Sequence, residues 1–234
     1  MWRALCLGAA TFVALCLHPP ATGAAGRTIT FRTADGRMVN ALLVEASQRP
    51  APAVVLVPML GRNRDDWQQV ADRLGEANIT AMAIDLPGLG FPGDGPSLAG
   101  WHTDVVAAVG YLASRPEIRA SAIGVAGASL GSSLAALAGA ADSRVRSLAL
   151  VSPALEYRGV RIESAMKQYG ARPALLIASA HDPYAARSTR ELAAGATGIR
   201  EMRWSETAAH GTTLLSRDQD LTGALVEWFR RTLG

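Results

Sequence analysis

The stretch Ala122-Ile123-Gly124-Val125-Ala126-Gly127-Ala128-Ser129-Leu130-Gly131 decides how this chain folds. Its apolar first half, 122–126, is typical of a buried strand, and the Ala/Leu-rich run from Leu130 predicts a helix to Ala138. Between them lies the pattern G-x-S-x-G, with Ser129 on the turn. A serine there adopts a strained backbone, and side chains two residues to either side would collide across the turn, so both positions need glycine. The stretch therefore predicts a strand, a sharp turn that carries Ser129, and a helix.

Strands and helices alternate on both sides of this stretch. Upstream, 53–57 is a continuous apolar run, as in parallel strands buried on both faces, and helical spacing follows through Trp67, Val70 and Leu74. Before it, segments 28–33 and 39–45 predict an antiparallel hairpin. Further strands are expected at 80–86, 147–152, 174–179 and 200–204, and helices near 97–114, 162–169, 185–194 and 213–233. This order predicts an α/β fold with a mostly parallel, doubly wound sheet, an N-terminal antiparallel hairpin and helices on both faces.

Length and composition are those of one folded domain. The chain has 234 residues, of which 49% are hydrophobic and 18% charged, and this mixture excludes a disordered chain. The formal net charge is +3, but the basic residues are scattered, and their longest run is Arg230-Arg231. A solvated basic surface explains this charge, so we expect no nucleic-acid partner.

Residues 1–25 read as a secretory signal peptide. Arg3 precedes an uncharged stretch at 4–17, and small residues follow at 21–25. About 14 apolar residues form only about 21 Å of helix, against a bilayer core of about 30 Å, so we expect cleavage and no stable membrane span. The expected product is an exported protein, periplasmic or secreted, formed by residues 26–234 as a single domain.

Both cysteines, Cys6 and Cys16, lie in this leader. The mature chain is therefore expected to have no disulfide, no thiolate metal ligand and no cysteine nucleophile. The alternative is a lipoprotein anchored through Cys16, although Leu15 is larger than the small residue that such processing prefers.

A serine hydroxyl needs a base to become a nucleophile, and few histidines are available. After leader removal only His102, His181 and His210 are left. Where a G-x-S-x-G turn carries the nucleophile, an acid and then a histidine follow it in the chain, which selects His210, in the last loop. Asp182 directly follows a predicted strand and is the expected acid, with Glu156 as the alternative. We expect His181 at the rim of the site and His102 in a structural role.

Acyl chemistry also needs two backbone N–H groups that bind an oxyanion. One is expected from Leu130, directly after the serine. The other should come from the loop after the strand at 53–57, and its position favours the N–H of Leu60. No His, Asp and Glu residues have the spacing of metal ligands, so we expect no metal and no other cofactor.

One further motif resembles a dinucleotide-binding loop. Gly88-Leu89-Gly90-Phe91-Pro92-Gly93 fits G-x-G-x-x-G after a strand. Pro92 and the following Gly93-Asp94-Gly95-Pro96 prevent an immediate helix, and no acid ends a strand about 20 residues later. We interpret this stretch as a turn-rich loop.

These residues together resemble the α/β-hydrolase family over nearly the whole mature chain. The resemblance rests on Val55–Trp67, Asp85–Gly90, Gly127–Gly131, Asp182 and His210-Gly211. It implies that Ser129, Asp182 and His210 act as nucleophile, acid and base. The chain departs from the family at Pro58-Met59, where His-Gly is common, and this bears on the geometry of the oxyanion loop. The chain is similar to small carboxylesterases and dienelactone-hydrolase-like proteins.

The sequence leaves little room for a lid over such a site. Only residues 153–173 separate two predicted strands, so we expect a minimal cap at about 153–170 and an open site for a small-molecule acyl substrate. The expected substrate contacts are Met59, Leu155, Tyr157 and Tyr184. We therefore expect an exported serine hydrolase that cleaves carboxylic esters or related acyl compounds through an acyl-enzyme. The alternatives are a non-catalytic binding or assembly module on the same fold and an acyltransferase with the same three residues.

Overall fold

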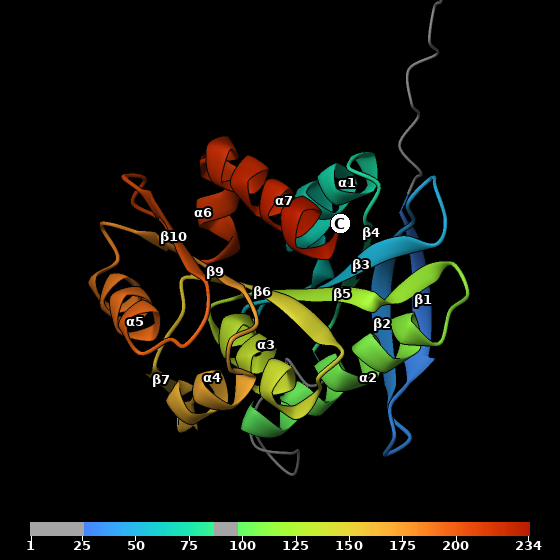
Figure 1. The fold of residues 1–234 in the computed structure, drawn as a ribbon, viewed down its shortest axis with the longest axis horizontal. Coiled ribbons are helices and arrows are strands. Elements are labelled where there is room, and N and C mark those ends of the chain that lie inside the picture. Colours follow the sequence, from blue (N-terminus) through green and yellow to red (C-terminus); the bar gives the residue numbers. More distant parts are fainter. Residues whose placement is uncertain (1–25, 87–97) are drawn as a thin grey trace, which may run out of the picture.

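A computed structural model describes residues 26–86 and 98–234, which form a central eight-stranded sheet of order β1-β2-β4-β3-β5-β6-β9-β10 (Figure 1). Its strands are β1 (Arg27–Arg32), β2 (Met38–Val44), β3 (Ala51–Val57), β4 (Thr80–Ile84), β5 (Ile118–Ala128), β6 (Val145–Val151), β9 (Ala174–Ser179) and β10 (Arg200–Ser205). From β4 to β10 in this order the neighbours are parallel. β2 is antiparallel to both β1 and β4. The predicted α/β fold, with its mostly parallel sheet and N-terminal hairpin, is confirmed.

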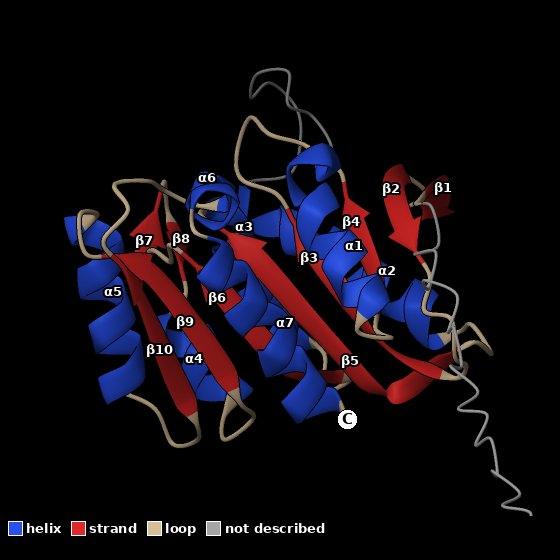
Figure 2. Ribbon diagram, turned by 90° about the horizontal axis from the view of Figure 1, so that it is seen from above, coloured by secondary structure: helices blue, strands red, loops and turns tan. Residues whose placement is uncertain are grey.

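Helices cover both faces of the sheet (Figures 1 and 2). One face carries α1 (Gln68–Glu76), α6 (Thr212–Arg217) and α7 (Gln219–Leu233). The other carries α2 (His102–Ala113), α3 (Leu130–Ala141), α4 (Glu163–Tyr169) and α5 (Pro183–Ala194). Two short 3-10 helices, η1 (Arg64–Trp67) and η2 (Leu98–Trp101), precede α1 and α2.

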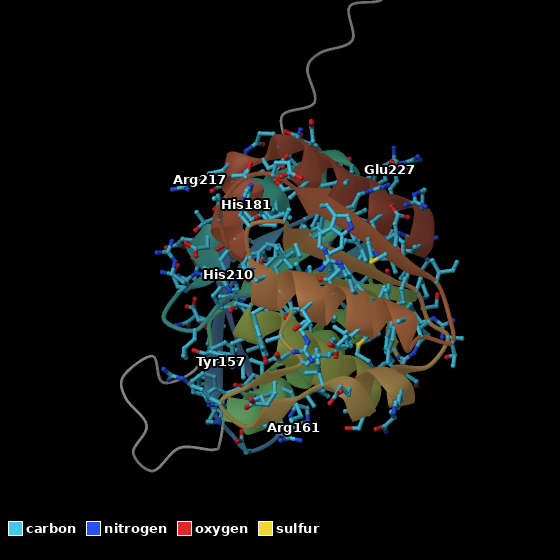
Figure 3. The ribbon with its side chains drawn as sticks, turned by 90° about the vertical axis from the view of Figure 1, so that its left-hand side faces the viewer. Tyr157, Arg161, His181, His210, Arg217 and Glu227 are labelled. Atoms are coloured by element: carbon cyan, nitrogen blue, oxygen red, sulfur yellow. The ribbon has the colours of Figure 1, made fainter. Side chains whose placement is uncertain are left out.

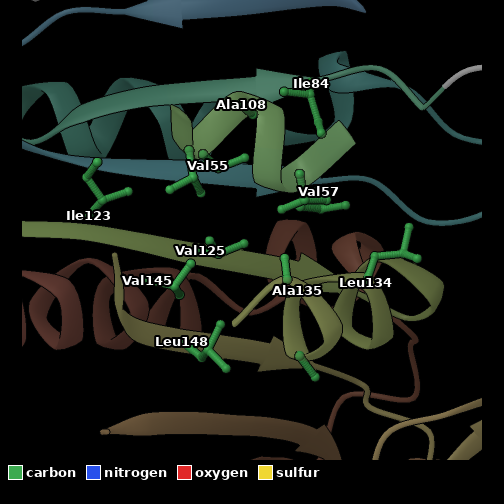
Figure 4. Close-up of a cluster of buried hydrophobic side chains, with 14 of the residues drawn as sticks. Val55, Val57, Ile84, Ala108, Ile123, Val125, Leu134, Ala135, Val145 and Leu148 are labelled. Atoms are coloured by element: carbon green, nitrogen blue, oxygen red, sulfur yellow. The ribbon is translucent and has the colours of Figure 1, made fainter. Parts of the chain in front are cut away.

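The sheet divides the hydrophobic core into two clusters, one on each face. In β3, the side chains of Val55 and Val57 belong to the cluster shared with α2 and α3 (Figure 4). Those of Val54 and Leu56 belong to the cluster under α1 and α7. All four are completely buried, and each burial stabilises the fold by about 1.5–3 kcal/mol. Because both faces are covered, the strand has a continuous apolar sequence instead of an alternating one.

The expected helix at 213–233 is interrupted, which corrects the sequence prediction. Asp218 has an extended backbone between α6 and α7, and its carboxylate accepts the Leu221 N–H at 3.4 Å and the Ser205 hydroxyl at 2.5 Å. An aspartate that caps a new helix competes with continuation of the preceding one. The polypeptide therefore turns at Asp218.

The expected cap region contains a small feature that the sequence did not predict. Glu156–Tyr157 (β7) and Val160–Arg161 (β8) form a short antiparallel hairpin before α4. Strands of two residues are too short to show an alternating pattern, so periodicity cannot detect them.

Some sequence predictions lie outside the described residues. These are the leader at 1–25, with Cys6 and Cys16, and the loop at 88–93. Across 26–86 and 98–234, no helix has the length and the apolar character needed to cross a bilayer.

Candidate active site

Ser129 lies on the sharp turn between β5 and α3. Its φ of 52° and ψ of −118° are unusual for a residue with a side chain and cost on the order of 1–3 kcal/mol. The Ser129 N–H donates to the Val151 carbonyl in β6 at 2.9 Å, which holds the turn on the sheet. A Cβ on Gly127 would lie 2.0 Å from the Gly131 carbonyl oxygen, and one on Gly131 would lie 2.3 Å from the Val57 carbonyl oxygen. Only glycine fits at both positions, because the atoms that a side chain would meet belong to the backbone and cannot rotate away.

A chain of hydrogen bonds connects Ser129, His210 and Asp182, which follow three different strands. His210 Nε2 lies 2.8 Å from Ser129 Oγ, and His210 Nδ1 lies 2.5 Å from Asp182 Oδ2. Asp182 Oδ1 accepts the Ala185 N–H at 3.1 Å and so caps α5. The His210 side chain is 50% exposed, whereas that of Asp182 is only 18% exposed. A carboxylate on Nδ1 leaves Nε2 to accept the serine proton, as a nucleophilic serine requires.

Of the two acids considered, Asp182 is the one in contact with His210. The Glu156 carboxylate instead accepts the Gly159 N–H at 2.6 Å, within the β7–β8 hairpin. That hydrogen bond stabilises the hairpin turn and directs the Glu156 carboxylate to its own segment of the chain.

Neither His181 nor His102 takes part in this chain of hydrogen bonds. His181 lies on the same face of the molecule as His210 (Figure 3), and its Nε2 is 3.5 Å from the exposed Glu206 carboxylate. His102 Nδ1 lies 2.7 Å from the Ala99 carbonyl, one turn earlier. Within the part of the chain that the structure describes, no group of three or more His, Cys, Asp or Glu side chains could hold a metal ion.

The loop after β3 packs against the loop that carries His210. Met59 Sδ occupies the space beside Gly211, where an added Cβ would lie only 2.0 Å from the sulfur. Leu60, the predicted oxyanion donor, follows Met59 in this loop. Leu130, the other predicted donor, is the first residue of α3, so its N–H has no acceptor within the helix. The oxyanion roles of both N–H groups stay predictions.

A carboxylate joins the same two loops at a second point. Asp66 in η1 accepts both Nε and Nη2 of Arg62 at 2.6 Å and the Thr212 hydroxyl at 3.1 Å. Thr212 follows directly after His210 and Gly211, so Asp66 holds the start of α6 against the loop after β3. The sequence does not predict this contact, because no local pattern relates residues so far apart in the chain.

The other expected substrate contacts lie in or beside the β7–β8 hairpin: Leu155 directly precedes it, Tyr157 is in β7, and Tyr184 is in α5. The Tyr184 hydroxyl donates to the Glu156 carbonyl at 2.7 Å, and the Leu155 N–H donates to Ser188 Oγ at 3.2 Å. Both bonds fasten the hairpin to α5. Figure 3 places Tyr157 on the same face as His210. Contact of these residues with a substrate stays a prediction.

Comparison with solved structures agrees with this fold. The DcsB structure, solved with a substrate analogue, has a TM-score of 0.79 at 13% identity and covers 89% of this chain and 99% of its own. The dienelactone hydrolase of Anabaena variabilis has a TM-score of 0.72 at 17% identity, with coverages of 90% and 100%. A thermostable carboxylesterase cloned from a metagenomic library has a TM-score of 0.72 at 17% identity, with coverages of 91% and 90%. At these identities the likeness establishes the fold.

In sequence, no curated protein matches the chain. The family described as serine aminopeptidase, S33 (Hydrolase_4) matches residues 48–186, more than half of the chain, including the turn at Ser129 and the aspartate at 182. The chain therefore belongs to the Hydrolase_4 (serine aminopeptidase, S33) family of α/β-hydrolases.

Proposed function

We propose that this protein is a serine hydrolase that cleaves carboxylic esters or related acyl compounds. The observation that carries the proposal is the hydrogen-bonded chain from Asp182 through His210 to Ser129. In an α/β-hydrolase, a serine on the turn after a central strand, with this chain of partners, has the contacts of an activated nucleophile.

In the proposed reaction, Ser129 Oγ attacks the acyl carbon while His210 Nε2 accepts the hydroxyl proton. The N–H groups of Leu130 and Leu60 bind the negative charge that develops on the acyl oxygen. Expulsion of the alcohol, which takes the proton from His210, leaves an ester on Ser129. His210 then activates a water molecule that hydrolyses this ester. Asp182 holds the imidazole tautomer and stabilises the imidazolium throughout.

Substitution of the serine tests this mechanism. Ser129→Ala should abolish labelling by a fluorophosphonate probe and lower the hydrolysis of p-nitrophenyl acetate by about 10³-fold or more. Ser133→Ala is a matched control, because Ser133 lies in α3, the helix that begins directly after Ser129, is buried, and its hydroxyl has no hydrogen-bond partner in the described part of the chain. Ser133→Ala should behave as the wild type. Unchanged labelling of Ser129→Ala would exclude Ser129 as the nucleophile.

We propose small or short-chain acyl substrates for this site. The proposal is supported by the small cap, which consists of the β7–β8 hairpin and α4, and by the half-exposed imidazole of His210. Met59, Leu155 and Tyr157 would line the acyl group. Among p-nitrophenyl esters from acetyl to palmitoyl, kcat/KM should be highest for the short chains, and best turnover of palmitate would contradict the proposal. Aminoacyl p-nitroanilides in the same panel measure the peptidase activity that the family description names.

We further propose that residues 1–25 direct export and are then removed. The basis is the order of charge, apolar stretch and small residues in the sequence. Expression of the full chain in a Gram-negative host, followed by fractionation and mass spectrometry, should find a periplasmic or secreted protein that begins between Gly23 and Gly26. A lipidated amino terminus at Cys16 would support the lipoprotein alternative, and an intact leader in the cytoplasm would contradict both.

A further inference from the structure

The carboxyl end of β6 holds the backbones of the loops that carry the reacting groups. Val151, the last residue of β6, accepts the Ser129 N–H at 2.9 Å. The next residue is Ser152, whose hydroxyl accepts the Gly211 N–H at 2.9 Å. Gly211 directly follows His210. Two adjacent residues thus hold the backbone of the serine and the backbone of its base.

Ser152 is itself held firmly. Its own N–H donates to the Ile177 carbonyl in β9 at 2.7 Å, and the residue is only 1% exposed. Its φ of 48° lies in the left-handed region, where residues with a side chain are uncommon. Glycine would adopt this conformation without strain but would lack the hydroxyl. Because Gly211 is also buried, its N–H would have no ready replacement for the Ser152 oxygen.

Two other buried serines hold the same loop on the other side of His210. Ser179, at the end of β9, donates its hydroxyl hydrogen to the Thr207 carbonyl at 2.7 Å. Ser205, at the end of β10, accepts the Thr207 N–H at 3.1 Å. The His210 loop is therefore fastened before the histidine by these serines and after it by Ser152.

We propose that Ser152 is a positioning residue for His210, and this inference rests on the proposed hydrolase function. Through the Gly211 N–H, its hydroxyl keeps His210 Nε2 at hydrogen-bond distance from Ser129 Oγ. Without this bond the loop keeps its attachments at Thr207 and Thr212, but the backbone directly after His210 loses the hydrogen bond that fixes Gly211. The fraction of molecules with the imidazole in place then falls, and a displacement of about 1 Å at a reacting group can cost about 100-fold in rate.

Ser152→Ala and Ser152→Gly separate positioning from stability. Both substitutions remove the hydroxyl, but alanine keeps the left-handed strain and glycine relieves it, so the two variants should differ in melting temperature. If the hydroxyl positions His210, both should lose about 10- to 100-fold in kcat/KM, mainly through kcat, with KM nearly unchanged.

Ser147→Ala is the matched control. Ser147 lies near the amino end of β6, far along this strand from the reacting groups, and is completely buried. Its hydroxyl accepts the Thr232 hydroxyl hydrogen at 2.8 Å. It should retain wild-type kcat/KM even if its melting temperature falls.

Amide hydrogen exchange at Gly211 provides a readout that does not depend on catalysis. Exchange should accelerate in both Ser152 variants, while exchange of the Ser129 N–H stays at its wild-type rate. Unchanged Gly211 exchange, unchanged kcat/KM, or a loss of kcat/KM confined to the less stable variant would each overturn the inference. A different outcome is faster exchange at Gly211 in the Ser152 variants together with a wild-type protein that hydrolyses no ester. That outcome would overturn the proposed function, and with it any role of Ser152 in positioning a base.

Discussion

The contact between Met59 and Gly211 predicts how a substitution beside His210 will act. Gly211 has φ 59° and ψ −134°, and an added Cβ would lie 2.0 Å from Met59 Sδ. Gly211→Ala therefore introduces backbone strain, of about 1–3 kcal/mol, and steric overlap, of about 1–3 kcal/mol. We expect the free energy of unfolding to fall by about 2–6 kcal/mol in this variant.

A second substitution separates the two costs. Met59→Ala removes the thioether, so the double variant Gly211→Ala/Met59→Ala has space for the new methyl group but keeps the backbone strain. The double variant should therefore be more stable than the two single changes predict together, by a coupling free energy of about 1–3 kcal/mol.

Urea unfolding of the four proteins, followed by tryptophan fluorescence, measures this coupling. Gly223→Ala is the control, because Gly223 lies in α7 and an added Cβ there meets no atom within 4 Å. That change should leave stability unaltered or raise it by up to about 1 kcal/mol. A wild-type urea midpoint for Gly211→Ala, or a coupling free energy near zero, would show that Met59 does not restrict the residue at position 211.

The remaining predictions concern other parts of the molecule. Asp182→Asn should lower kcat by about 10⁴-fold, because asparagine favours the wrong imidazole tautomer, whereas Glu156→Gln should keep wild-type activity; the reverse result would assign the acid to the hairpin. Gly127→Ala should abolish folding or cost more than about 3 kcal/mol in thermal unfolding, since its Cβ would lie 2.0 Å from a backbone oxygen, and a wild-type Tm would contradict the turn geometry. Arg37→Ala should cost about 3 kcal/mol at pH 7, because it leaves the buried Asp104 carboxylate without its ion-pair partner at 2.7 Å. Burial raises the pKa of Asp104 in the folded protein. Protonation of Asp104 therefore contributes to the free energy of unfolding in full below the unfolded pKa of about 3.9, and this contribution is lost as the pH rises through the folded pKa. The Arg37→Ala deficit should therefore shrink when unfolding is measured at falling pH, and a constant deficit would contradict the account.

Sequence patterns predicted those elements whose cause is local. Strand β3 was recognisable because burial on both faces demands a continuous apolar run. The turn at Ser129 was recognisable because only glycine avoids a clash between residues a few positions apart. The interruption of the last helix at Asp218 was missed, since the Ser205 hydroxyl, from the end of β10, helps to hold that residue. The β7–β8 hairpin was missed because strands of two residues show no alternating pattern, and its contact with Tyr184 comes from a helix further along the chain.

The order of residues along the chain is enough to predict which chemical groups lie at the ends of strands, because strand periodicity and the steric demands of a tight turn are properties of neighbouring residues. Which strand ends meet follows from the packing of the folded chain. It brought His210 Nε2 to 2.8 Å from an oxygen 81 residues away, and Asp182, rather than Glu156, against the imidazole. It also gave the buried hydroxyl of Ser152 a partner in the His210 loop. These contacts depend on how β5, β6, β9 and β10 pair and pack. The strength of a hydrogen bond depends on differences of a few tenths of an ångström between donor and acceptor, and no pattern of residue types specifies distances that closely.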